Sequence, residues 1–337
     1  TISLLIIPAF AYLIYQTNKK IFSSQKFLIK AFIAFLIGAT PYLFSVFAAF
    51  RKTPINWDDP VNVTNLIRLM TRADFGSFSA TEFLVGQNVQ MRLVQVWTFF
   101  GFLKNDFLII GVVLIALGFI YLYFKDRIIF WFFAILFFLN GPFFLFYSTF
   151  PLTNDFVFGI WERFLLEPYV YSIVPLTFGM IATYEFIGKK LKSKVFPLGF
   201  LVAIFFFPLF LFLLNFNKTD LSNFDLGDKL GRDIFASAKP SSIIFFLNDT
   251  MTFNSQYIYY TEKQHFDKKM ILLGSLKNFY YRKQVMDTYP DLVFSEHFKS
   301  EKSDTAYSFT LDLIDDNIGK FDIYSTNEQG IEKGEWI

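Results

Sequence analysis

Uncharged apolar runs constrain this chain more than any other feature of its sequence. One of them, from Val195 to Phe216, contains no acidic or basic side chain, and a helix needs about 20 such residues to cross the hydrocarbon core of a bilayer. Five further stretches are similarly apolar: Ile2–Tyr15, Phe27–Phe50, Phe107–Phe124, Ile128–Phe150 and Tyr171–Gly188. The sequence therefore predicts an α-helical polytopic membrane protein with about six spans.

The first of these stretches is short for a span, and the chain opens on Thr1 instead of a methionine. We interpret Ile2–Tyr15 as the end of a helix that begins upstream, which makes the chain a fragment lacking its N-terminal spans. A signal peptide is the alternative. No basic segment precedes the stretch, however, and no small-residue cleavage site follows it.

Lysine and arginine residues predict the orientation of the spans. They gather in alternate connections, at Lys19, Lys20, Lys26 and Lys30, at Lys125 and Arg127, and at Lys189, Lys190, Lys192 and Lys194. The positive-inside rule places these connections in the cytoplasm. Loops 51–106 and 151–170, with Asp58 and Arg163, and all residues after 216 are then expected outside a plasma membrane, with the bacterial inner membrane as the expected one.

Charge separates a membrane domain, residues 1–216, from a C-terminal domain, residues 217–337. The first has 17 Lys and Arg against 10 Asp and Glu, and the second has 14 against 19. A basic membrane region beside an acidic domain suits contact with the lipid bilayer and gives no reason to expect nucleic acid as a partner. Cysteine is absent, which excludes disulfides and thiolate metal sites.

The C-terminal domain shows alternating helical and strand patterns, which predict a small α/β fold with parallel strands. The expected helices are Asp228–Ala238, Phe253–Gln264 and Lys277–Thr288, and the expected strands are Ser242–Leu247, Met270–Leu273 and, on a weaker pattern, Tyr307–Leu313.

Polar candidates for a site lie in the predicted outward loops. Arg68 and Arg72 are four residues apart in a short amphipathic helix, so they share one helix face, and two guanidiniums form a good clamp for phosphate. Arg51 could reach a lipid-linked phosphate from the end of the second span. Ordinary anchoring at the membrane interface is the alternative for all of these cations.

Asp58 and Asp59 could bind a divalent metal as adjacent oxygen ligands, but Asp-Asp-Pro is also a common start of a turn, which we favour. No metal or other cofactor is therefore expected. Trp57 and Trp161 could stack on a sugar or sit in the interfacial aromatic belt. His265 and His297 are interpreted as surface histidines without ligand partners.

Three stretches of the sequence resemble motifs of a known protein family. Pro41–Phe78, with the core Pro54-Ile55-Asn56-Trp57-Asp58-Asp59-Pro60, resembles the external loop of a polytopic family that includes the endoplasmic-reticulum protein O-mannosyltransferase of animals and bacterial relatives first catalogued as a domain of unknown function. Glu162-Arg163-Phe164 is similar to a second signature of that family. Ile243–Tyr257 resembles its strand-turn-helix motif, although Asn248 and Met251 depart from it and leave Asp249 as the main polar residue of the turn.

The resemblance implies a GT-C glycosyltransferase that moves a sugar from a polyprenyl-phosphate donor to a protein or glycan acceptor on the outer side, as in protein O-mannosylation. It implies substrate contacts by Arg51, Asp58, Asp59, Arg68, Arg72, Glu162, Arg163 and Asp249. It also implies a catalytic carboxylate in a loop upstream of Thr1, so that this chain alone is expected to be inactive.

Two functions of other classes remain open. A transporter would need a polar path, and the spans from Phe107, Ile128 and Val195 contain no ionisable residue for coupling. A membrane scaffold or receptor would bind its partner through the acidic C-terminal domain and would not need the membrane part.

Overall fold

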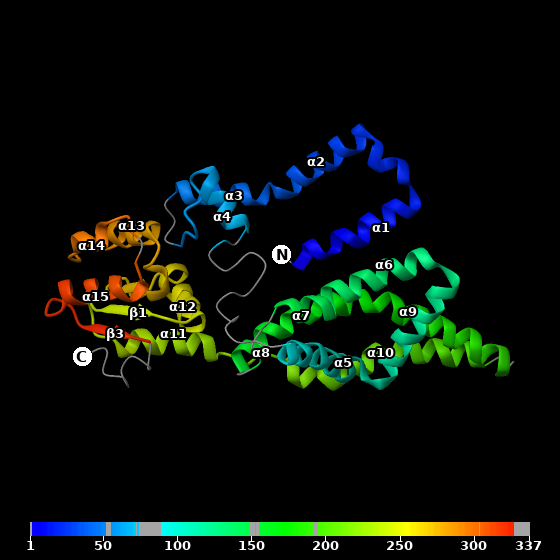
Figure 1. Cartoon of the computed structure of the whole chain (residues 1–337). Coiled ribbons are helices and arrows are strands. Elements are labelled where there is room, and N and C mark those ends of the chain that lie inside the picture. Colours follow the sequence, from blue (N-terminus) through cyan, green and yellow to red (C-terminus); the bar gives the residue numbers. More distant parts are fainter. Residues whose placement is uncertain are drawn as a thin grey trace. The chain divides into compact units, whose positions relative to one another are not determined.

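The structure, a computed structural model, describes residues 2–51, 55–71, 73, 89–148, 152, 155–191, 195–302 and 304–326. The chain forms two compact units, the first from Thr1–Thr40 and Met70–Thr219 and the second from Pro41–Leu69 and Asp220–Ile337. Helices dominate, and the strands lie in the C-terminal part of the chain (Figure 1). The C-terminal residues thus form a unit together with Pro41–Leu69, a segment that the sequence analysis assigned to the membrane domain.

The first unit is built of helices. They are η1 (Ile2–Ile6), α1 (Ile7–Thr17), η2 (Lys19–Ser23), α2 (Gln25–Ala39), α5 (Val89–Lys125), α6 (Arg127–Phe138), η5 (Leu139–Phe143), α7 (Phe144–Ser148), α8 (Asp155–Glu162), η6 (Arg163–Leu165), α9 (Leu166–Leu191) and α10 (Phe196–Thr219). Among the described residues, four helical stretches are long and apolar enough to cross a membrane: Val89–Lys125, Arg127–Ser148, Phe158–Lys190 and Phe196–Asn217. The bent pair of α2 and α3 (Pro41–Phe50) would make a fifth. The fold is therefore that of a helical membrane protein, as the apolar runs predicted.

Helix α5 begins earlier than the sequence predicted. At about 1.5 Å per residue its 37 residues would extend about 55 Å, well beyond the roughly 30 Å of a hydrocarbon core. The helix is interrupted at Leu108, whose backbone (φ 59°, ψ 168°) is not helical. The apolar part after this break matches the predicted span, and residues 89–106, which belong to the predicted outward loop 51–106, are helical as well.

Glycines allow α5 and α9 to pack at very short range. A Cβ atom on Gly118 would lie 1.6 Å from the carbonyl oxygen of Pro175, and one on Gly179 would lie 1.8 Å from that of Leu114. Small residues of this kind let helix backbones approach closely in membranes, where packing drives association. The contact between these two helices thus depends on both glycines.

Two hydrogen bonds, at separate positions along the helix pair, show that α5 and α9 run in the same direction. The Tyr169 hydroxyl donates to Asp106 at 2.7 Å, and the Tyr121 hydroxyl donates to Glu185 at 2.9 Å. The basic ends of the two helices, marked by Lys125 in the last turn of α5 and by the lysines in the last turn of α9, therefore lie at the same end of the unit. The positive-inside rule requires the basic connections that follow α5 and α9 to lie on one side of the membrane, and this arrangement meets that requirement.

The second unit contains a three-stranded parallel sheet in the order β2-β1-β3. Its elements are α3, α4 (Val63–Thr71), α11 (Leu226–Ser237), β1 (Ile243–Phe246), α12 (Asp249–Gln256), η7 (Tyr257–Thr261), β2 (Lys269–Leu272), η8 (Leu273–Ser275), α13 (Phe279–Thr288), α14 (Glu296–Lys299), α15 (Ala306–Asn317) and β3 (Ile323–Ser325). The central strand β1 is buried along its whole length, as is typical of a parallel strand covered on both faces. The predicted small α/β fold with parallel strands is confirmed.

Alternate residues of β1 face two separate cores. Ile243 and Phe245 pack with residues of α13, α14 and α15, including Val285, Phe298, Phe309 and Leu313. Ile244 and Phe246 pack with residues of α11, η7 and β2, including Phe235, Ile258 and Met270. The sheet is therefore covered by helices on both sides.

The predicted strand Tyr307–Leu313 was wrong, because these residues lie in α15. The sequence Tyr-Ser-Phe-Thr-Leu-Asp-Leu alternates like a strand, but Phe309 and Leu313, four residues apart, are both fully buried on one helix face. Thr305 caps the helix by accepting a hydrogen bond from the Ser308 amide at 3.1 Å, which fixes the start of the helix. The helix expected over Phe253–Gln264 instead begins at Asp249 and ends at Thr261, the last turn being π-helical.

Candidate functional site

The loop from Ile55 to Asn62 is held by hydrogen bonds that centre on Asp59. Asn56 Nδ2 donates to the Asp59 carboxylate at 2.7 Å, and the Val61 amide and Asn65 Nδ2 donate to the Asp59 carbonyl oxygen at 2.7 and 2.8 Å. Asp58 and Asp59 both have positive φ angles, 58° and 41°, in the left-handed region that Asp tolerates better than most residues. These contacts give Asp59 the role in a turn that the Asp-Asp-Pro pattern predicted.

Asp58 lies beside Arg68 of α4. Arg68 Nε is 3.9 Å from Asp58 Oδ1, the carboxylate side chain is 8% exposed, and the arginine side chain is 47% exposed. Asn62 caps α4 by accepting a hydrogen bond from the Asn65 amide at 2.9 Å, which fixes the helix that carries Arg68. The guanidinium has five N–H groups, so a half-exposed Arg68 can pair with Asp58 and still present donors to an anion.

The other predicted cations belong to other parts of the chain or lie outside the residues that the structure describes. Arg72 lies outside the described residues, and Arg51 is exposed at the end of α3. Glu162 and Arg163 are exposed in the first unit, where α8 meets η6. The phosphate clamp by Arg68 and Arg72 and the substrate contacts expected of Arg51, Glu162 and Arg163 therefore stay predictions.

Trp161 cannot stack on a substrate sugar or belong to an interfacial belt, so both predictions for this residue were wrong. Its side chain projects from the last turn of α8 and is fully buried in a cluster with Phe99, Leu145 and Leu165. Trp57, by contrast, is 40% exposed.

Asn248, in the polar turn after β1, caps helix α12: its side chain accepts a hydrogen bond from the Met251 amide at 3.0 Å. Asn248 is therefore the N-cap residue of α12. Asp249 is the exposed first residue of α12 and adds a favourable negative charge at the helix N-terminus. It lies at the carboxyl end of a parallel strand, the usual position of ligands in open α/β sheets.

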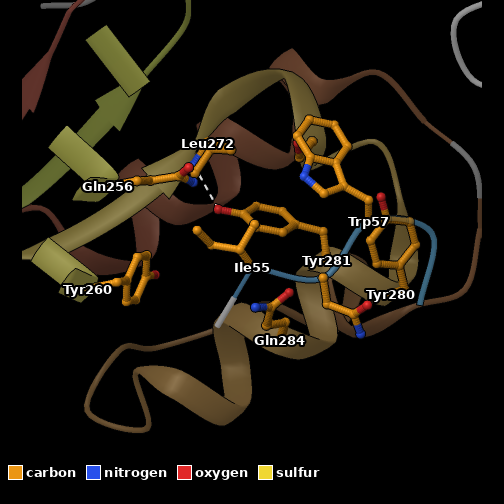
Figure 2. A pocket seen from close by; sticks show the side chains of 10 residues that line it. Ile55, Trp57, Gln256, Tyr260, Leu272, Tyr280, Tyr281 and Gln284 are labelled. Atoms are coloured by element: carbon orange, nitrogen blue, oxygen red, sulfur yellow. Dashed lines mark hydrogen bonds between the residues drawn. The ribbon is translucent and has the colours of Figure 1, made fainter. Parts of the chain in front are cut away.

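A small recess, which the sequence analysis did not predict, lies where the loop meets the α/β domain (Figure 2). Aromatic and carboxamide side chains dominate its lining, which consists of Ile55, Asn56, Trp57, Gln256, Tyr260, Leu272, Ser275, Tyr280, Tyr281 and Gln284. The Tyr281 hydroxyl accepts a hydrogen bond from the Leu272 amide at 2.7 Å, at the carboxyl end of β2. Burial raises the pKa of Tyr260 to about 12 and raises that of Tyr281 as well, so both phenols are neutral at physiological pH.

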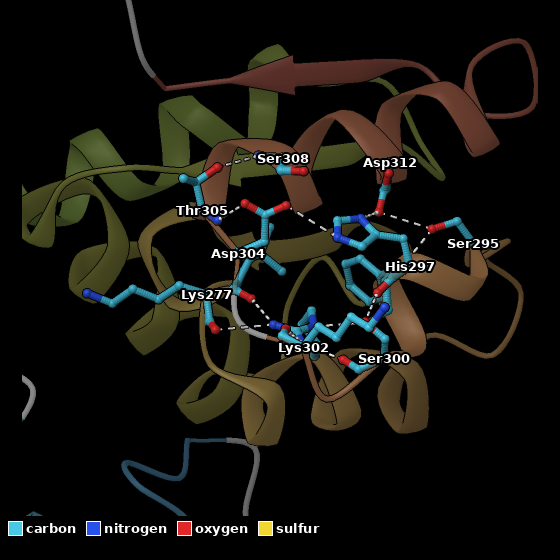
Figure 3. Close-up of polar contacts among 12 residues, drawn as sticks. Lys277, Ser295, His297, Ser300, Lys302, Asp304, Thr305, Ser308 and Asp312 are labelled. Atoms are coloured by element: carbon cyan, nitrogen blue, oxygen red, sulfur yellow. Dashed lines mark hydrogen bonds and ion pairs between the residues drawn. The ribbon is translucent and has the colours of Figure 1, made fainter.

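His297 lies between two carboxylates (Figure 3). Its Nδ1 is 2.8 Å from Asp312, its Nε2 is 3.3 Å from Asp304, and its ring stacks on Phe309 with centroids 4.8 Å apart. The sequence did not indicate these two carboxylate partners, although a side chain that is 38% exposed agrees with the expected surface position. His265 stacks on Phe235. The described residues contain no group of three or more His, Cys, Asp and Glu that could hold a metal ion.

Arg282 is fully buried close to His297, since both side chains contact the ring of Phe309. Its guanidinium lies 3.7 Å from the ring centroid of Phe309 and donates to five backbone carbonyl oxygens, those of Leu276 (2.8 Å), Lys277 (3.2 Å), Phe298 (3.0 Å), Ser300 (2.7 Å) and Lys302 (3.3 Å). Burial lowers the pKa of this group, but arginine stays protonated in proteins. Arg282 thus acts as a structural cation that joins α13 to the segments around α14.

No known family model, curated protein or solved structure matches this chain. The resemblance to the mannosyltransferase family therefore depends on the three local motifs. The structure brings parts of two of them into one unit, because Ile55–Trp57 and Gln256 line the same recess.

Proposed function

We propose that this chain belongs to a membrane glycosyltransferase that transfers a sugar from a polyprenyl-phosphate donor to an acceptor on the outer side of the membrane. The support is the three family-like motifs together with a fold of several candidate spans and a small α/β domain. The GT-C architecture and the extracytoplasmic position of the C-terminal domain, residues 217–337, belong to this proposal.

The pairing of Asp58 with Arg68 is the observation that carries the proposal. The buried carboxylate lies 3.9 Å from the Nε of a half-exposed guanidinium, within the stretch that resembles the family's external loop. A cation held in this way can donate to the oxygens of a lipid-linked phosphate and stabilise their charge as the phosphate departs.

Transfer by this route breaks the bond between the sugar's anomeric carbon and the phosphate oxygen, and the acceptor hydroxyl oxygen forms the new bond. The proton of that hydroxyl passes to a general base. We assign no described residue to this role, since Asp58 is paired with Arg68 and Asp59 holds the turn. Asp58 is therefore a positioning residue and Arg68 the phosphate ligand.

The test is transfer of labelled mannose from polyprenyl-phosphate mannose by the natural protein that contains this chain, reconstituted in vesicles. We expect Arg68→Met to lower kcat/KM by roughly 10- to 1000-fold, the effect of removing a donor that stabilises the transition state, and Arg68→Lys to retain part of the activity. Arg232→Met is the matched control, because Arg232 is also a partly exposed, ion-paired arginine of the second unit. Full activity of Arg68→Met at normal expression would remove Arg68 from the site, and a wild-type protein that transfers no sugar from a panel of such donors would refute the proposal.

A further inference from the structure

The chemistry of the recess in Figure 2 points to a ligand different from the phosphate. Its lining contains four aromatic rings, from Trp57, Tyr260, Tyr280 and Tyr281, and no charged side chain among the residues that the structure describes there. A site without charge does not repay the desolvation of an anion. Aromatic faces and carboxamides together are suited to a ring that has an apolar face and neutral hydroxyl groups at its edge.

We propose that this recess binds one neutral hexose unit, with the sugar ring against Trp57 and its hydroxyl groups on Gln256 and Gln284. The inference deepens the proposed function and rests on it for the origin of the sugar, either the donor or a glycan acceptor. Each carboxamide offers a donor and an acceptor side by side, which matches the paired hydroxyl groups of a sugar.

The dimensions of the recess define how the sugar is held. The cavity volume of the recess is about 30 Å³, and the empty space is about 390 Å³ when open solvent at its mouth is included. Because the cavity exceeds the 10–15 Å³ or so that a single water needs, it accommodates one hydroxyl or hydroxymethyl group. The ring itself then lies in the mouth, where Trp57 is exposed.

The walls of the recess come from both parts of the second unit. In Figure 2, Trp57 and Tyr280 lie on one side and Gln256 and Tyr260 on the other, with the Tyr281 ring between them. The hydrogen bond from the Leu272 amide to Tyr281 fixes that ring at the end of β2. A rigid floor of this kind lowers the entropy cost of ordering side chains when a ligand binds.

The loop from Ile55 to Asn62 connects this recess to Arg68, the phosphate ligand of the proposed function. Trp57 directly precedes Asp58, the partner of Arg68, so a sugar that packs on Trp57 is held by the same short loop that positions the guanidinium. A saccharide site here would therefore serve transfer directly.

Binding is tested on the whole chain in detergent by saturation-transfer NMR and calorimetry, with the methyl glycosides of mannose, glucose and galactose as probes. We expect saturable binding of at least one glycoside and a loss of affinity of at least about 10-fold in Trp57→Ala, the scale of a central aromatic contact. Trp57→Phe should retain most of the affinity. Gln284→Ala should also weaken binding, and because Gln284 lies in α13, a loosened loop cannot explain its effect. Trp97→Ala is the control, since Trp97 is a 79% exposed tryptophan of the first unit.

Short-chain polyprenyl-phosphate mannose distinguishes the two origins of the sugar. A donor site predicts that Arg68→Met weakens binding of this compound but not of methyl mannoside, and an acceptor site predicts that the two ligands bind together. Absence of saturable binding by all three glycosides, or equal affinity in wild type, Trp57→Ala and Gln284→Ala, would overturn the inference. Sugar transfer without glycoside binding would overturn the hexose site and leave the proposed function standing. Glycoside binding without sugar transfer would count against the proposed function and leave the hexose site standing.

Discussion

Replacing Arg282 with methionine should destabilise the C-terminal α/β domain by about 3–5 kcal/mol. Three of the five hydrogen bonds of Arg282 to carbonyl oxygens are 3.0 Å or shorter, and bonds from a charged donor contribute roughly 1.5 kcal/mol or more each. The contact with Phe309 at 3.7 Å adds up to about 2 kcal/mol where water is excluded. Methionine relieves the several kcal/mol that burial of the cation costs, but it leaves the carbonyl oxygens without their donor.

Hydrogen exchange on the whole chain in detergent measures this loss directly. Since about 1.4 kcal/mol corresponds to a factor of ten, protection of the amides in α13, α14 and α15 should fall by roughly two to four orders of magnitude. Amides of α5 and α9 in the first unit should not change. Arg282→Lys should give an intermediate loss, because one ammonium group cannot reach carbonyl oxygens in so many directions.

The matched control is Arg232→Met. Arg232 also has several polar contacts, with Asp228 and Glu262, but its side chain is 40% exposed, and exposed ion pairs contribute about 1 kcal/mol at most. A loss in Arg282→Met no larger than that in Arg232→Met would refute the reasoning that burial, and not the number of bonds, decides the effect.

Two further outcomes follow from the packing and the charge pattern. Gly118→Ala and Gly179→Ala should each separate α5 from α9, because the added Cβ would clash with a carbonyl oxygen; the melting temperature of the protein in detergent should fall, whereas Gly199→Ala, with open space around it, should leave it unchanged. The prediction fails if all three variants melt alike. In this cysteine-free chain, a cysteine replacing exposed Asp249 should react with an impermeant thiol reagent on intact cells and one replacing Lys190 should not, and the reverse pattern would invert the proposed topology.

Most of the fold could be predicted because burial dominates the sequence pattern. The apolar runs identified every segment that the structure offers as a span, and the run Ile243–Phe246 identified the central strand, since a strand covered on both faces is apolar throughout. The start of α5 and the nature of α15 could not be predicted in this way. Residues 89–107 contain too many polar side chains to suggest a continuation of the span, and α15 alternates like a strand although tertiary packing makes it a helix.

The candidate site could be predicted only where its residues lie close together in the sequence. The turn at Asp59 follows from neighbouring residues, and its partners Asn56 and Asn65 lie within six positions. The recess could not be predicted, because its two walls are about 200 positions apart in the sequence and meet only in the folded unit. For the same reason nothing in the sequence indicated that Trp57 would share a recess with Gln256 and Gln284.

The composition of the second unit has a consequence for how the protein is made. Its two parts, Pro41–Leu69 and Asp220–Ile337, are separated by about 150 residues that belong to the helical unit. A ribosome that adds roughly 5–20 residues per second needs about 8 to 30 seconds to translate that insertion. During this interval the loop with Trp57 and Asp58 has left the ribosome while the sheet and helices that cover it do not yet exist. The loop can therefore reach its folded contacts only after the membrane helices that separate the two parts have been made. Until then it is accessible to chaperones and proteases. Completion of the site thus requires completion of the chain.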